Sequence, residues 1–252
     1  MIDFLPPRWL ERSPSTNSKL LRELEDGADL PSGTVLATDD QTAGRGRGRN
    51  QWQTRPGRDL ACSFVLHARV AAEDLCSLSM AVALGVADLL AGLGLPVRTK
   101  WPNDVISGNR KICGILPEIP RLPDSGSLPA VVVVGVGLNV GMSREEAAAI
   151  DQPATSIFIE TGDLPAPRDL LPELLAALAP RLDRWCHGGF RALRDDWESR
   201  CAGLGQLVTV VDDGTRRQGV LEGFGDAGQL RLADKDGTVD VWTGHLLLDD
   251  RL

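Results

Sequence analysis

A strongly cationic segment lies near the start of an acidic chain. Five arginines and no Asp or Glu occur between residues 41 and 58, whereas the 252-residue chain as a whole has a net charge of −8. Within the segment, the run GRGRGRNQW alternates glycine with arginine from Gly44 onward. Glycine lets the backbone approach a ligand closely, and the planar guanidinium of arginine pairs well with phosphates and carboxylates. The pattern predicts a loop that is mobile when empty and becomes ordered around an anion.

Two other interpretations of this loop stay open. A loop of this composition can be merely solvated, or it can bind RNA in the manner of RGG-like segments. The pI near 5.0 argues against general nucleic-acid binding, which usually needs a basic domain face. We therefore favour a local binding site for a small anion.

Three further stretches combine charged, amide and glycine residues in short strings. They are KWPNDV at residues 100–105, RKICGIL at 110–116, which contains Lys111, and GVGLNV at 135–140, which contains Asn139. Each has an ordinary structural interpretation by itself. A lysine at the start of an apolar strand usually extends its charged end into solvent, and an Asn after a strand often only ends it. Whether they form a functional site depends on which other motifs occur with them in the same chain.

Several common site types are excluded or disfavoured. Five cysteines and three histidines are widely spaced, with no C-x-x-C pair and no H-x-x-x-H pattern, so we predict no protein-held metal and no disulfide framework. The G-x-x-x-x-G-K-[ST] loop of many ATPases is missing from the sequence. GFGDAG at residues 223–228 formally matches G-x-G-x-x-G, but a strand-like QLRLAD follows it instead of a helix, which indicates a hairpin turn.

The surrounding sequence predicts the elements that hold these residues. Ser15 or Thr16 can cap a helix that ends at Gly27, and apolar residues at helical spacing predict a buried helix over 73–93. Amphipathic helices are expected over 168–185 and 190–200. Strands are predicted for GTVLATD, DLACSFVLHA, PVRTKW, DVIS, KICGILPEI and AVVVVGVGLNV, with a Pro/Ser/Gly-rich loop at 120–129.

The chain changes character at Gly203. From there, four or five short strands separated by Gly and Asp turns predict a small β-barrel. We therefore expect two domains, residues 1–202 and 203–252. Because the sequence has no apolar signal core and no run of about 18 apolar residues, we expect a cytoplasmic protein without membrane attachment.

The strings SPSTN, QTAGRGR, KWPND, RKICGIL and GVGLN occur in this order, and together they resemble the biotin–protein ligases over nearly the whole chain. The resemblance implies an α/β (α+β) catalytic domain with a mixed β-sheet flanked by helices, followed by an SH3-like β-barrel. It also implies a two-step reaction. Biotin and ATP, with Mg²⁺, give biotinyl-AMP and pyrophosphate, and a lysine of a biotin carboxyl carrier protein then receives the biotinyl group.

The resemblance assigns roles to residues at matching positions. Lys111 is expected to bridge the biotin carboxylate and the α-phosphate, and Asp104 to orient or deprotonate the acceptor lysine, unless it is only a turn carboxylate. The residues implied as catalytic are Lys111, Arg45, Arg47 and Asp104. Those implied for biotin are Ser15, Thr16, Asn17, Gln41, Arg45, Gly46, Arg47 and Lys111, and those for ATP or adenylate are Arg45, Arg47, Lys100, Trp101, Asn103, Lys111 and Asn139. The family pattern is close to GRGRxGRxW, and here the second Gly-Arg pair falls one position early, so Arg49 receives no role.

Some members of the family carry an N-terminal helix-turn-helix domain and repress transcription. Ser15 comes too early for such a domain, so we expect a monofunctional ligase that does not bind DNA. The nearest rival is a lipoate–protein ligase, against which the arginine loop and KWPND favour biotin. An RNA-binding module would instead show salt-sensitive RNA binding and no biotin-dependent exchange of pyrophosphate. We expect a monomer or weak homodimer, and the terminal barrel could dock the carrier, cover ATP or only stabilise the protein.

Overall fold

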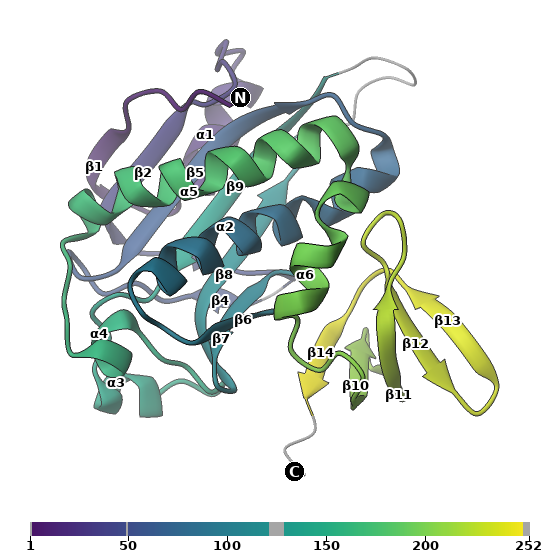
Figure 1. Cartoon of the computed structure of the whole chain (residues 1–252). Coiled ribbons are helices and arrows are strands. Elements are labelled where there is room, and N and C mark those ends of the chain that lie inside the picture. The colour runs from purple at the N-terminus through teal and green to yellow at the C-terminus, as the bar shows by residue number, and fades with distance from the viewer. Residues whose placement is uncertain (1, 49, 121–128, 249–252) are drawn as a thin grey trace.

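A seven-stranded mixed sheet forms the centre of the larger part of the chain in the computed structural model, which describes residues 2–48, 50–120 and 129–248 (Figure 1). Its strands lie in the order β1-β2-β5-β9-β8-β7-β6; β1 and β2 are parallel, and the other neighbours are antiparallel. The strands are β1 Arg8–Ser13, β2 Val35–Gln41, β5 Leu60–Ala68, β6 Val97–Lys100, β7 Asp104–Ser107, β8 Arg110–Glu118 and β9 Ala130–Leu138. Arg49 and most of the predicted loop at 120–129 lie outside the described residues.

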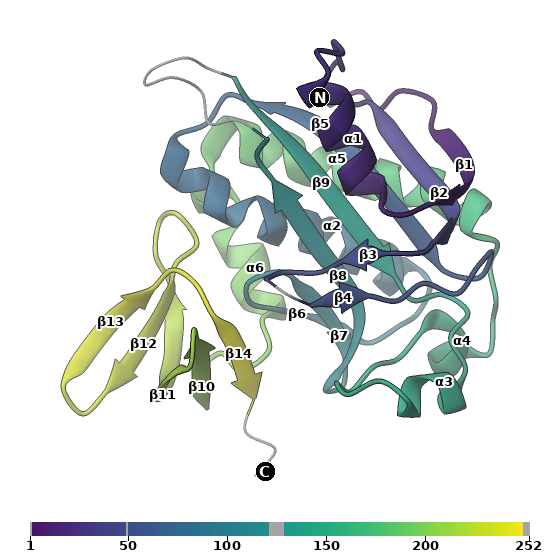
Figure 2. The same ribbon diagram turned by 180° about the vertical axis from the view of Figure 1, so that it is seen from behind.

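Different helices bury the two faces of this sheet. α2 (Leu78–Gly92) and α5 (Pro167–Gly188) lie over one face in Figure 1, and α1 (Thr16–Glu25) lies over the other in Figure 2. Strand β9 shows how its sequence serves both faces. Val132 and Val134 join the large core with α2 and α5, whereas Val133 packs with Leu20 of α1 in a smaller cluster. The continuous apolar run therefore belongs to a strand that is covered on both sides.

The predicted α/β class and most of the predicted elements are confirmed, with some differences. The helix expected over 73–93 begins as a 3₁₀ segment, Ala72–Ser77, and only then becomes α2. The helix expected over 190–200 is divided into a 3₁₀ turn, Phe190–Ala192, and α6, Arg194–Arg200. β1 and the short helices α3 (Arg144–Ala148) and α4 (Ile157–Thr161) were not predicted from the sequence. These three elements have few buried apolar residues, which is the signal that periodicity detects.

The helical segment Ala72–Gly92 is long and apolar enough to cross a membrane by length and composition alone. However, 72% of its 18-residue apolar stretch, whose hydropathy is 1.8, is buried inside the protein. Gly85 shows how closely α5 packs against it, because a Cβ atom there would lie 2.7 Å from Leu178 Cδ2 and 3.0 Å from Leu178 Cα. This burial is that of a core helix.

An ion-pair network joins α2, α5 and α6 at their exposed side. Asp88 of α2 lies 2.7 Å from Arg181 Nε of α5 and 2.6 Å from Arg200 Nη1 of α6. Burial alone would raise the pKa of Asp88, but the hydrogen bonds and charges of the two arginines outweigh it, so this pKa lies below its ordinary value. The network fixes α6, and the chain leads from α6 into the second sheet.

The C-terminal part forms a five-stranded antiparallel sheet, in agreement with the four or five strands expected. Its strands lie in the order β13-β12-β11-β10-β14. They are β10 Leu207–Asp212, β11 Thr215–Phe224, β12 Leu230–Asp234, β13 Gly237–Val241 and β14 His245–Leu248. The GFGDAG string ends β11 and turns into β12, so the predicted hairpin turn is confirmed. The SH3-like assignment and the domain boundary at residue 203 stay predictions.

The turn between β11 and β12 packs against the part of the chain that forms the seven-stranded sheet and its helices. Trp101 Nε1 donates a hydrogen bond to the carbonyl oxygen of Gly228 at 3.2 Å. Beside this bond, the Phe224 ring meets Phe190 and Trp197 edge-on, with centroids 6.1 and 6.0 Å apart. Figure 1 shows the C-terminal sheet beside α6 and the β6–β7 edge of the large sheet. A buried aromatic contact therefore joins the two sheets.

Candidate active site

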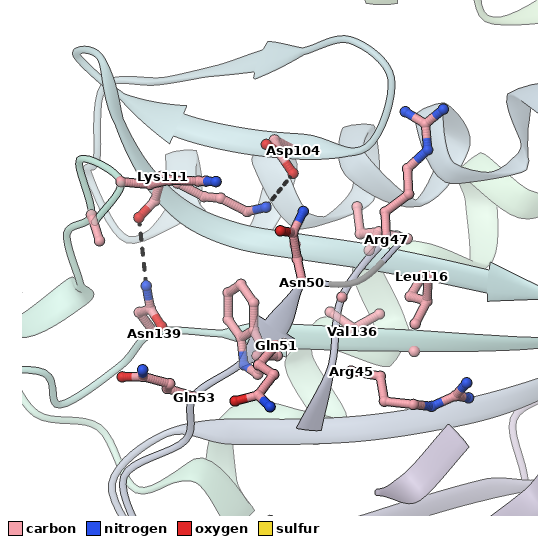
Figure 3. A pocket seen from close by; sticks show the side chains of 18 of the residues that line it. Arg45, Arg47, Asn50, Gln51, Gln53, Asp104, Lys111, Leu116, Val136 and Asn139 are labelled. Carbon is pink, nitrogen blue, oxygen red and sulfur yellow. Dashed lines mark hydrogen bonds and ion pairs between the residues drawn. The ribbon is translucent and has the colours of Figure 1, made fainter. Parts of the chain in front are cut away.

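A cavity of about 450 Å³ lies on the face of the large sheet that carries α1. The hairpin of β3 (Gly44–Arg45) and β4 (Gln51–Trp52) crosses this face, so the described part of the predicted arginine loop is folded over the cavity (Figures 2 and 3). Most of the predicted site residues line it, namely Ser15, Thr16, Asn17, Gln41, Arg45, Gly46, Arg47, Asn103, Asp104, Lys111 and Asn139. The structure thus brings together residues from five separate stretches of the sequence.

One end of the cavity is a recess of polar side chains that hold one another in place. Ser15 caps α1, and the Thr16 hydroxyl lies 2.6 Å from the hydroxyl of Ser63 on β5. Ser63 in turn donates to Asn17 Oδ1 at 2.5 Å, while Gln41 Oε1 accepts from the Thr16 backbone N–H at 3.0 Å. Ser15, Thr16, Asn17 and Ser63 are buried, and Gln41 is partly buried. Because these groups are hydrogen-bonded to one another, they present donors and acceptors in fixed directions.

Glycines of β8 and β9 make the floor of the cavity flat. Gly114 and Gly137 are neighbours in the sheet, and the indole of Trp52 lies directly on them. A Cβ atom at Gly137 would come within 2.3 Å of Trp52 Cε2, and one at Gly135 within 2.5 Å of Asn17 Oδ1. The glycines of GVGLN therefore allow side chains of α1 and the hairpin to lie against the sheet.

Lys111 and Asp104 form an ion pair at the centre of the cavity. Lys111 Nζ lies 2.6 Å from Asp104 Oδ1 and 5.7 Å from the centroid of the Trp52 ring (Figure 3). The backbone of Lys111 is fixed as well, since its N–H donates to Pro153 O at 2.8 Å and its carbonyl accepts from Thr155 N at 2.9 Å. The charged end is thereby presented over the glycine floor in a defined position.

The two arginines of the hairpin are held by different parts of the molecule. Arg45 pairs with the carboxylate of Glu118 on β8, which also accepts a 2.8 Å hydrogen bond from Asn17 Nδ2. Arg47 Nη1 donates to the carbonyl oxygen of Gly244 in the C-terminal sheet at 2.6 Å. One arginine is thus tied to the polar recess and the other to the segment that leads into β14.

The amides predicted to recognise the nucleotide also stabilise the fold. Asn139 Nδ2 donates to Thr155 O at 3.0 Å, and Asn103 Nδ2 donates to Ile115 O at 2.8 Å. Across the described ranges, neither side-chain oxygen has a hydrogen-bond partner. For a ligand, these oxygens are therefore the available groups, and both are acceptors.

Lys100 and Trp101, predicted to bind the nucleotide, do not line this cavity. The Trp101 ring is buried, and its N–H is bonded to Gly228 in the junction between the sheets. Burial lowers the pKa of Lys100, with Asp104 opposing and Lys111 adding to the effect. The structure thus gives Trp101 a place in the junction, and Lys100 a place behind the Lys111–Asp104 pair.

A buried carboxylate clamps the end of the arginine loop. Asp59, which is 1% exposed, accepts hydrogen bonds from the backbone N–H groups of Val140 at 2.8 Å and Gly141 at 3.1 Å. Its other oxygen accepts from the backbone N–H of Arg55 at 3.0 Å and lies 3.4 Å from the Arg55 guanidinium, which lines the cavity. The clamp joins the loop to the segment that follows Asn139.

Several residues of the site were not predicted from the sequence. They are Trp52, Arg55, Asp59, Ser63, Glu118, His245 and the lining segment 149–154. The position of Trp52 at the end of the arginine motif was a usable signal. Asp59, Ser63 and His245 carry no sufficient local signal, because what they meet is distant in sequence: Val140 and Gly141 for Asp59, Thr16 and Asn17 for Ser63, and the cavity itself for His245.

The family resemblance implies Mg²⁺, and the carboxylates of the site decide how it could be held. In the described ranges, no group of three or more His, Cys, Asp or Glu side chains could hold a metal ion. Mg²⁺ is usually held by one or two carboxylates together with substrate phosphates. The carboxylates that line the cavity, Asp104 and Asp151, fit that shared mode of binding.

Bringing a carboxylate up to a second anion requires cations around the junction, and this cavity supplies them next to a rigid polar recess. That arrangement defines a ligase that acts on a small acid. Comparison with known families agrees, because the chain belongs to the Biotin/lipoate A/B protein ligase family, whose sequence profile matches residues 9–139.

Individual relatives support the same class. The chain is 35% identical to the biotin–[acetyl-CoA-carboxylase] ligase of Paracoccus denitrificans over 90% of this chain and 94% of that protein. It is 33% identical to the Mycobacterium tuberculosis enzyme of the same name, over 92% and 85%. A biotin protein ligase from Aquifex aeolicus in complex with biotin and ATP has the same fold, with a TM-score of 0.78, 25% identity and coverage of 97% and 98%. The predicted ligase class is confirmed.

Proposed function

We propose that this chain activates biotin with ATP as biotinyl-AMP and transfers the biotinyl group to a lysine of a biotin carboxyl carrier protein, such as that of acetyl-CoA carboxylase. The observation that carries the proposal is the position of Lys111, with Arg45 and Arg47, beside the polar recess in one cavity. The names of the P. denitrificans and M. tuberculosis relatives support both the acid and the acceptor.

The chemistry explains why two steps are needed. A free carboxylate does not acylate an amine at neutral pH, because its oxygen is a poor leaving group. Joining the carboxylate to AMP gives a mixed anhydride that an amine can attack. The first step brings two anions together, so it depends on cations in a water-poor site.

Each part of the cavity has a role in this reaction. The ureido ring of biotin needs both donors and acceptors, and the recess of Ser15, Thr16 and Gln41 supplies them on a rigid frame. The glycine floor leaves room for the Trp52 indole, which lines the cavity. Lys111 would lie at the junction of carboxylate and α-phosphate, and Mg²⁺, carried in with the triphosphate, would neutralise further charge.

The Lys111–Asp104 pair gives Asp104 a role in the first step. At 2.6 Å, the carboxylate holds the charged end of Lys111 in place until the substrates arrive. The remaining assignments, in particular Arg45 and Arg47 closing over the adenylate and Asn139 accepting from adenine, stay predictions. The expectation that the chain does not bind DNA also stays a prediction.

The proposal is tested by biotin-dependent exchange of labelled pyrophosphate into ATP. We expect exchange in the wild type, and a loss of about 10²-fold or more in Lys111→Ala, because a cation at the reacting centre is removed. Lys235→Ala, in an exposed turn of the C-terminal sheet, is the matched control and should exchange normally. Lipoate replaces biotin in a parallel reaction. Absence of exchange with biotin in the wild type would sink the proposal, and exchange with lipoate alone would transfer it to the other acid.

A further inference from the structure

His245 lines the cavity although it belongs to the C-terminal sheet, where it is the first residue of β14. It lies at the exposed rim. The residue before it, Gly244, accepts the 2.6 Å hydrogen bond from Arg47 Nη1, which fixes the start of the strand beside the arginine hairpin. A side chain at this rim lines the cavity and can also be reached by a residue of another protein.

The charged groups that act on His245 come from four elements of the larger domain. They are Arg47 after β3, Lys100 on β6, Asp104 on β7 and Lys111 on β8. Partial burial lowers the pKa of His245, the charge of Arg47 lowers it further, Asp104 opposes the change, and the two lysines add to it. An imidazole among three cations is neutral at pH 7 and keeps one nitrogen lone pair for a proton.

The transfer step needs such a group. The acceptor lysine of a carrier protein has an ordinary pKa of about 10.4 and arrives protonated at neutral pH. Asp104 is poorly suited to take its proton, because it lies 2.6 Å from Lys111 Nζ and would have to give up that ion pair beside other cations. In the described ranges, the His245 ring has no hydrogen-bond partner that would have to be displaced.

We propose that His245 is the base that accepts a proton from the acceptor lysine in the transfer step, an assignment that rests on the proposed ligase reaction. The lysine ammonium gives one proton to the imidazole, and its nitrogen then attacks the biotinyl carbonyl carbon. A C–N bond forms as the bond between that carbon and the phosphate oxygen breaks. AMP leaves with the electron pair, and the second proton of the nitrogen passes to the AMP phosphate or to water.

The test separates the two steps of the reaction in His245→Ala. Pyrophosphate exchange, which does not involve the acceptor, should stay within about twofold of wild type. Single-turnover transfer from preformed biotinyl-AMP to the carrier domain should fall about 10²-fold at pH 7, as for loss of a general base. Added imidazole should restore part of the rate. His187→Ala, an exposed histidine on α5, is the matched control and should transfer normally.

The pH profile gives a readout that a structural role would not change. With a neutral imidazole as base, wild-type transfer should be level between the lowered pKa of His245, beneath about 6.5, and the pKa of the lysine near 10.4. Without the base, the reaction needs the free amine, so the rate of His245→Ala should rise about tenfold per pH unit over that range. An unchanged profile, or equal loss of both steps, would overturn the assignment. Absence of exchange in the wild type would instead count against the ligase reaction itself.

Discussion

At the scale of single residues, the absence of side chains is as important as their presence. Gly114 and Gly137 pair across β8 and β9, and the Trp52 indole lies on both. In most sheets the side chains of such a pair would fill the space above the strands. Here the space is left for Trp52 and for the cavity beside it.

This role makes Gly137 a sensitive position. A Cβ atom at Gly137 would lie 2.3 Å from Trp52 Cε2 and 2.4 Å from its Nε1, so Gly137→Ala has to displace the indole into the cavity. Overpacking of this kind typically costs about 1–3 kcal/mol, and we expect the Kd for biotin to rise by about tenfold or more. Isothermal titration calorimetry measures this change. Gly92→Ala, at the end of α2 with open space around its Cβ position, is the control and should bind biotin normally. Equal affinities in the two variants would show that the floor is not part of the biotin site.

The sequence could predict many of the site residues because they occur in recognisable strings. Lys111, Gln41, Arg45 and Arg47 were found in this way, and all four line the cavity. Trp101 was predicted by the same reasoning, yet its ring lies in the junction between the sheets. A string can mark a residue as functionally important without showing which residue it contacts. The hydrogen-bond partner of Trp101, Gly228, is 127 residues away in sequence.

At the scale of elements, the arginine hairpin and the segment after β9 are joined by Asp59. Its carboxylate accepts hydrogen bonds from the backbone N–H groups of Arg55, Val140 and Gly141. The end of the arginine loop and the segment after β9 therefore share one buried anion. The Asp59 side chain is fully buried, and the Arg55 side chain is 10% exposed. A buried charge of this kind is stable only while its partner of opposite charge and its hydrogen bonds are all in place.

Removing this carboxylate should therefore be costly. Asp59→Ala leaves the Arg55 charge and three backbone N–H groups without this partner, and we expect the free energy of unfolding to fall by about 3–5 kcal/mol. Urea denaturation followed by circular dichroism measures the loss. Asp39→Ala breaks the exposed pair with Arg168, 2.5 Å apart, and is the control, with an expected loss below about 1 kcal/mol. Comparable losses in both variants would contradict the clamp.

Elements with strong apolar patterns could be predicted, and those without them could not. β9 and α2 are apolar along most of their length, and both were found. β1, by contrast, is an edge strand with the sequence RWLERS, in which charged residues alternate irregularly with apolar ones. Edge strands are often charged because their free side faces solvent, which removes the pattern that identifies a strand.

At the scale of the whole molecule, two of the contacts that hold the C-terminal sheet against the rest of the chain are hydrogen bonds to glycine carbonyl oxygens. One is the Arg47–Gly244 hydrogen bond at the rim, and the other is the β11–β12 turn, where Gly228 accepts from Trp101. From the sequence, GFGDAG could be identified as a turn, but its packing partner could not. The partners of Gly228 are Ser77, Met80 and Trp101, which are far away in the chain.

The docking turn gives a direct test of the junction, because two glycines in the C-terminal sheet share a left-handed backbone. Gly228 has φ +89° and Gly214 has φ +82°, so alanine at either position should cost about 1–2 kcal/mol of backbone strain. At Gly214 the added Cβ meets nothing within 4 Å, whereas at Gly228 it would lie 2.9 Å from both Met80 Sδ and Ser77 Cβ. The difference in stability between the two variants therefore measures the contact of the β11–β12 turn with Ser77 and Met80.

We expect Gly228→Ala to lower the free energy of unfolding by about 1–3 kcal/mol more than Gly214→Ala, because the turn has to move away from α2. Hydrogen exchange should then rise in β11, in β12 and at the start of α2, and only in Gly228→Ala. If the turn also positions β14, transfer to the carrier should fall in this variant more than pyrophosphate exchange does, since His245 lies on that strand. Equal losses of stability in the two alanine variants would show that the C-terminal sheet is held mainly by its other contacts.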